Sequence, residues 1–114
     1  MNGIDDFLEH LRVERAMSAH TLDAYRRDLD ALAGWALAQG AGETCRLDAT
    51  HLREFVAAEH RRGLSPKSLQ RRLSACRSFY LWLLKRGRID ANPADAIRAP
   101  KAALMRRSPA SGSP

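Results

Sequence analysis

The sequence has few cysteines, few aromatic side chains and no long apolar run. Two of its 114 residues are cysteines, Cys45 and Cys76, and their spacing fits neither a CxxC motif nor a metal-ligand pattern. A disulfide framework usually needs more cysteines, so we expect both to be reduced. No apolar run approaches the roughly 20 residues that span a bilayer. The first segment, MNGIDDFLEHL, is acidic where a secretory signal is basic. We therefore expect a cytoplasmic protein.

Residue patterns that support catalysis or cofactor binding are also scarce. The four histidines have no metal-ligand spacing. The glycines stand singly at expected helix ends, so there is no glycine-rich phosphate loop, and we expect no cofactor and no metal. Aromatic residues make up 6% of the chain, which is too few to stack on successive bases of a single strand. Trp82 is therefore expected to pack against a neighbouring helix or domain.

Acidic residues are scarce in the second half of the chain. The net charge is +6, but it is unevenly distributed. Residues 1–60 carry 6 basic and 11 acidic side chains, a net charge of −5, whereas residues 61–114 carry 13 basic and 2 acidic ones, a net charge of +11. A basic surface is typical of proteins that bind polyanions. We expect the binding surface to lie mainly in the second half.

Apolar spacing and helix-capping signals predict an all-α fold with no strand. Helices are expected at residues 4–13, from the cap Ser18 to Gly40, from the cap Asp48 to Arg62, from the cap Ser65 to Arg86, and in a short fifth run after Asn92 to Ile97. Residues 41–47 are expected to form a loop. Residues 1–100 are interpreted as one domain, and residues 101–114, rich in Pro, Ser and Gly, as a linker or disordered tail.

The predicted helix at 66–86 has two unlike faces. An apolar stripe is formed by Leu69, Leu73, Cys76, Tyr80 and Leu83. The opposite face carries Lys67, Arg71, Ser74 and Ser78, flanked by Gln70 and Arg77. Six basic residues and no acidic one lie between Pro66 and Arg86. Such a helix is roughly 32 Å long and fits the ~12 Å major groove of DNA. The alternative is a basic face that serves solubility alone.

The predicted helix that starts after Ser18 offers a second polar surface. His20 and Thr21 lie in its first turn, where free N–H groups favour a phosphate. Ala24 and Arg27 continue the same face. Ser18 taken alone fits an ordinary helix cap that binds no ligand better than it fits a phosphate ligand.

Three segments carry a resemblance to a known family. They are SAHTLDAYRRDLDALAGWA, then GLSPKSLQRRLSACRSFYLWLLKRGRIDANPADAI, then RAPK. In this order they resemble the N-terminal core-binding, SAM-like domain of the tyrosine recombinase (phage integrase) family, in its bacterial Xer branch. The resemblance implies a compact bundle of four to five helices that forms one jaw of a clamp around a double-stranded DNA half-site, with neighbouring recombinase protomers as partners. The implied DNA-binding residues are Ser18, His20, Thr21, Ala24, Arg27, Lys67, Gln70, Arg71, Ser74 and Arg77.

The chain departs from the family pattern in its catalytic residues. The family cuts DNA with a C-terminal domain that holds a tyrosine nucleophile and an HxxR element, but no histidine here is followed three positions later by arginine. Both tyrosines, Tyr25 and Tyr80, lie on apolar stripes, where a core role is expected. We therefore expect this chain to lack the catalytic domain of a recombinase and not to catalyse on its own. The alternative function is a helical protein-interaction domain whose basic face docks an acidic partner.

Overall fold

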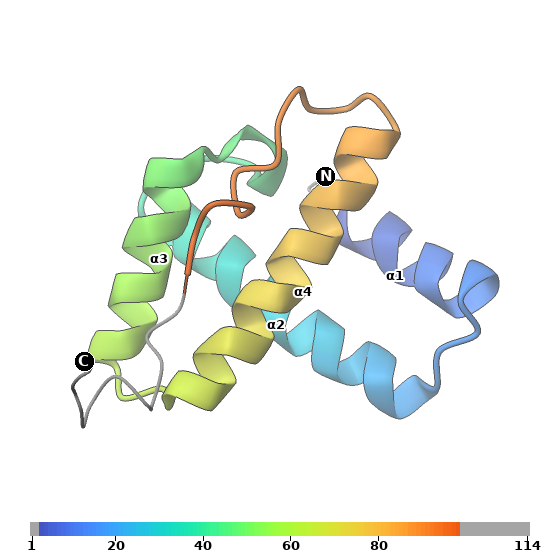
Figure 1. The fold of residues 1–114 in the computed structure, drawn as a ribbon, viewed down its shortest axis with the longest axis horizontal. Helices are drawn as coiled ribbons and strands as arrows, with labels where there is room; N and C mark the ends of the chain where they lie inside the picture. Colours follow the sequence, from blue (N-terminus) through green and yellow to red (C-terminus); the bar gives the residue numbers. More distant parts are fainter. Residues whose placement is uncertain (1–2, 99–114) are drawn as a thin grey trace, which may run out of the picture.

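The computed structural model describes residues 3–98, and within that range the protein consists of helices joined by short connections (Figure 1). The helices are α1 (Ile4–Glu14), α2 (Ala19–Ala38), the single-turn 3₁₀ helix η1 (Thr44–Arg46), α3 (Ala49–Arg61) and α4 (Pro66–Lys85). Residues 3–98 contain no strand, so the predicted all-α class is confirmed there. None of the helices in this range is long and apolar enough to span a membrane. The predicted tail at 101–114 lies outside the described residues.

The three longer helices α2, α3 and α4 begin where side chains accept otherwise unpaired backbone N–H groups. Ser18 accepts from Thr21 N at 3.2 Å, and Ser65 accepts from Ser68 N at the same distance. Asp48 accepts from His51 N while the His51 ring accepts from Asp48 N, a reciprocal capping box. All three predicted caps are confirmed.

Helix α4 is the central element, because it contacts α1, α2 and α3. Figure 1 shows it crossing the middle of the molecule, with α3 and α1 on opposite sides. The predicted apolar stripe of α4 is buried, and Leu73, Cys76 and Tyr80 are at most 1% exposed. Trp82 is buried against Phe7 of α1, as expected from its sequence context. Both cysteines are free thiols.

The predicted fifth helix is wrong, because residues 93–96 form turns instead. Two backbone bonds span three residues each, from Asp95 N to Asn92 O and from Ile97 N to Ala94 O, and no α-helical ladder follows. Arg77 donates to the carbonyl oxygens of Ala94 and Ile97, so these acceptors are held by a side chain of α4. Ala94 and Ile97 are buried in the core. Tertiary contacts therefore override the local Asn-Pro start signal.

Candidate nucleic-acid interface

A hollow of about 350 Å³ lies between the N-terminal part of α2 and the first half of α4. Its lining residues are His20, Thr21, Ala24, Tyr25 and Asp28 from α2 and Arg71, Ser74 and Ala75 from α4. We call this the α2–α4 hollow. Half of the ten residues expected to bind DNA line it, although they come from two separate stretches of sequence. Packing of α2 against α4 brings these two stretches together.

The side chain of Arg71 reaches across the hollow to a buried carboxylate. Its Nε donates to Asp28 Oδ2 at 3.1 Å and its Nη2 donates to Oδ1 at 2.8 Å. This hydrogen bonding raises the pKa of Arg71 above its ordinary value. The Arg71 side chain is 49% exposed, whereas that of Asp28 is 2% exposed. The polar face of α4 is therefore partly engaged with α2 rather than wholly free.

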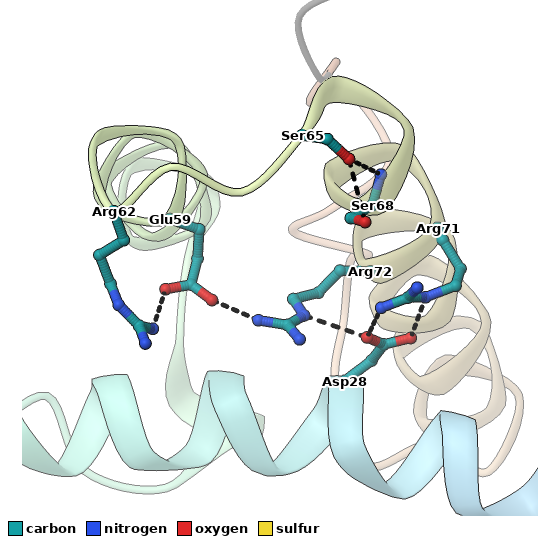
Figure 2. Close-up of polar contacts among 7 residues, drawn as sticks. All are labelled: Asp28, Glu59, Arg62, Ser65, Ser68, Arg71 and Arg72. Atoms are coloured by element: carbon teal, nitrogen blue, oxygen red, sulfur yellow. Dashed lines mark hydrogen bonds and ion pairs between the residues drawn. The ribbon is translucent and has the colours of Figure 1, made fainter.

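Asp28 also binds the next residue of α4, and the contacts continue to α3 (Figure 2). Arg72 donates from Nε to Asp28 Oδ1 at 3.0 Å and from Nη1 to Glu59 Oε1. Arg62, at the end of α3, donates to the other oxygen of Glu59 at 2.7 Å. We call this series, Arg71–Asp28–Arg72–Glu59–Arg62, the charge chain. It connects α2, α3 and α4.

Sequence reasoning missed Asp28, Glu59 and Arg72 as functional candidates. A signal was nevertheless present in the helical spacing. Asp28 lies three residues after Tyr25 and four before Leu32, which places it on the apolar stripe of α2. Glu59 and Arg72 occupy corresponding places on the apolar stripes of α3 and α4. Charged residues on buried stripes require partners, so their spacing predicts a buried ion pair.

The other five expected DNA-binding residues do not line the hollow. Ser18 forms the cap of α2 and also donates from its hydroxyl to Thr21 Oγ1 at 3.1 Å. Arg77 holds the 92–97 turn through the two carbonyl bonds described above. Arg27, Lys67 and Gln70 are exposed, and within residues 3–98 neither cation forms an ion pair. DNA contact by all ten residues stays a prediction.

A second hollow continues the surface along α4. It has a volume of about 160 Å³, and its lining includes Ser78 and Lys85 of α4 and Arg15 after α1. Ser78 and Lys85 lie four and eleven residues after Ser74, on the same helical face. No acidic residue lines this second hollow. The cationic surface therefore extends along most of α4.

Neither tyrosine is placed to act as a nucleophile. Tyr80 is fully buried and donates from its hydroxyl to Thr44 O at 2.7 Å. Burial raises the pKa of this phenol well above its ordinary value. Tyr25 packs edge-on against Phe7 with ring centroids 6.0 Å apart. The predicted core roles of both residues are confirmed. Residues 3–98 also contain no cluster of three metal-ligating side chains.

Four main helices, with a hollow between α2 and α4 that Arg71 and Asp28 line, define a small all-α domain. Residues 4–87 match the family described as Phage integrase, N-terminal SAM-like domain. The chain belongs to this family, which confirms the resemblance seen in the sequence.

Named relatives agree with this family. The chain is 68% identical over 102 residues to Tyrosine recombinase XerC of Xanthomonas campestris pv. campestris (strain B100), a match that covers 90% of this chain and 32% of the relative. It is 67% identical over 99 residues to Tyrosine recombinase XerC of Xylella fastidiosa (strain 9a5c), covering 87% and 34%. The chain thus spans about a third of the length of these relatives. No solved structure matches it.

Proposed function

We propose that this chain is the DNA-gripping domain of a site-specific tyrosine recombinase similar to XerC. It binds a duplex half-site as one jaw of a clamp, beside other recombinase protomers, during strand exchange such as the resolution of chromosome dimers in the cytoplasm. The cutting chemistry belongs to a separate catalytic domain. The relatives named as tyrosine recombinases support this proposal.

One structural observation carries the proposal. The α2–α4 hollow brings His20, Thr21 and Ala24 of α2 together with Arg71 and Ser74 of α4. These two sets of residues are far apart in the sequence, and each is expected to bind DNA. Hydroxyl, imidazole and guanidinium donors are the groups that contact phosphates and base edges. Small residues at two of the five positions allow a duplex to approach closely.

A second observation favours the alternative, docking of an acidic protein. A hollow of about 420 Å³ between α3 and the end of the described chain has an apolar floor, which includes Val56 and Ile97, and a basic rim of Arg53, His60, Arg61 and Arg98. This surface suits an acidic segment with apolar side chains. It lies on α3, whereas all ten residues expected to bind DNA lie on or beside α2 and α4.

A binding selection distinguishes the two functions. The chain is used to select duplexes from a random library, and the selected duplex and a shuffled version are then titrated with the chain by fluorescence anisotropy, with poly-glutamate as competitor. We expect a preference for the selected duplex that poly-glutamate does not remove. Lys67→Ala is expected to lower the affinity for both duplexes by about the same factor, because a lysine in the first helical turn acts as a point charge toward phosphate. Binding to poly-glutamate without a duplex preference would favour the protein-docking alternative.

A further inference from the structure

The charge chain contains more buried charge than packing of the helices requires. Asp28 and Glu59 are 2% and 3% exposed, and Arg72, which lies between them, is 11% exposed. Removing charges from water is costly, and apolar residues of similar size often give equal or greater stability. In some proteins such buried charges fix one particular arrangement of side chains instead of adding stability. The relevant question is which surface group this arrangement holds in place.

Arg71 is that group, because it is the member of the charge chain that reaches the α2–α4 hollow from α4. A guanidinium carries five N–H donors in one plane. Asp28 accepts from the edge formed by Nε and Nη2, so both oxygens of the carboxylate fix the plane of Arg71. The edge formed by Nη1 and Nη2 keeps donors that no described residue accepts. Arg71 is therefore held on one edge and available on the other.

A second arginine of α4, Arg72, fixes the position of Asp28. Arg72 donates to the same Oδ1 atom that accepts from Arg71, and Glu59 accepts from the other end of Arg72. Figure 2 shows these side chains in series between α3 and α4, above α2. The orientation of Arg71 thus depends on a carboxylate of α3. No residue of α3 lines the α2–α4 hollow.

We propose that Asp28 is a positioning residue that aims Arg71 at a base edge of the bound duplex, and that Arg72 and Glu59 extend this control to α3. The inference rests on the proposed DNA-binding function. The proposal gives Asp28 a part in sequence preference, although the phosphates of DNA repel its carboxylate. It also assigns a role in DNA recognition to Glu59, which is buried on α3.

The neutral variant Asp28→Asn produces two effects of opposite sign. It removes a negative charge from beneath the hollow, which raises the attraction for any duplex. It also replaces one of the two oxygens that accept from Arg71 with an NH2 donor, so the two parallel bonds that hold Arg71 are lost and a contact made only with the preferred sequence weakens. A residue important only for folding would lower both affinities together. Asp30→Asn is the matched control, because Asp30 is an exposed carboxylate of the same helix and forms no ion pair within residues 3–98.

The experiment measures affinities of the chain and its variants for the selected and the shuffled duplex. We expect Asp28→Asn to lower the selected-to-shuffled ratio about tenfold, the scale of one bidentate base contact, with binding to the shuffled duplex equal or tighter. Asp30→Asn should leave the ratio unchanged. In an Arg71→Ala background, Asp28→Asn should cause no further loss of the ratio, because it acts through Arg71. Glu59→Gln should lower the ratio in the same direction.

Arg71→Lys keeps the test decisive if Asp28→Asn fails to fold. Lysine keeps the charge but cannot be held by two parallel bonds, so we expect it to lower the ratio while preserving binding to the shuffled duplex. Independent, additive effects of Asp28 and Arg71 would overturn the inference, as would an unchanged ratio in Arg71→Lys. No duplex binding by the unaltered chain would reject the proposed function itself, and with it this inference. Duplex preference that survives loss of Arg71 would reject this inference alone.

Discussion

Cys76 and Tyr80 lie one turn apart on the inner face of α4, and both are inaccessible to water. Burial raises the pKa of the Cys76 thiol from 9.0 to about 12, with the nearby Asp28 carboxylate as a smaller contribution. The thiol is therefore protonated throughout the neutral range. Because the thiolate is the reactive form, Cys76 is chemically inert in the folded protein. Cys45 is half-buried and lies outside the core stripe of α4.

Alkylation by iodoacetamide at pH 8 tests this difference. We expect the folded chain to be modified at Cys45 and protected at Cys76, and the urea-unfolded chain to be modified at both, as read by mass spectrometry of peptides. The free energy of unfolding should also fall as the pH rises from 9 toward 12, since the unfolded thiol ionises before the folded one. Equal modification of both cysteines in the folded chain would contradict the burial of Cys76.

At the scale of elements, helix starts were predictable because their signals are local. Ser18, Asp48 and Ser65 accept backbone N–H groups three residues away, so a short window of sequence contains both partners. The short run after Asn92 carried the same kind of signal and formed turns instead. Its outcome depends on Arg77, which lies 17 and 20 residues before the carbonyls it binds. No local pattern contains that information.

The cap of α4 gives a prediction for a single element. Ser65→Ala removes the oxygen that accepts from Ser68 N, and we expect it to lower the free energy of unfolding by about 1 kcal/mol. Ser78→Ala makes the same chemical change within α4, where alanine favours the helix, so it should leave stability unchanged or slightly higher. Urea unfolding followed by circular dichroism measures both. Equal losses in the two variants would show that Ser65 does not act as a cap.

At the scale of the whole molecule, the α2–α4 hollow was predictable in part. Periodicity identified the two polar faces, and packing places five of their residues around one hollow. The pairing of Arg71 with Asp28 was not predictable, since the two residues are 43 positions apart and the helical pattern does not fix which turns of α2 and α4 meet. The same reason applies to Arg72 and Glu59. Helical periodicity predicts which side chains share a face of α2 or α4. The tertiary arrangement decides which of these charges form ion pairs within the protein.

The salt dependence of duplex binding follows from this arrangement. Four cations without an ion pair within residues 3–98 lie along the proposed DNA face and its continuation: Arg27, Lys67, Lys85 and Arg15. If each displaces one counterion, log K should fall with log[salt] with a slope of about −3.6. Lys85→Ala should reduce the slope by about one, and Arg53→Ala on α3 should leave it unchanged. A slope near zero, or an equal effect of both substitutions, would place the duplex on another surface.

The 92–97 turn determines where the next part of the polypeptide is attached. Helix α4 ends at Lys85, but Ala94 and Ile97 return the chain to the core, and Ile97 and Arg98 lie against α3. A segment joined after residue 98 is therefore tethered at the flank of α3 and not at the tip of α4. Because residues 86–97 fold back to the core, they do not lengthen the connection to such a segment. Since a shorter tether raises the effective concentration of what it carries, we expect loss of the Arg77 bonds to lengthen the tether of any group attached after residue 98.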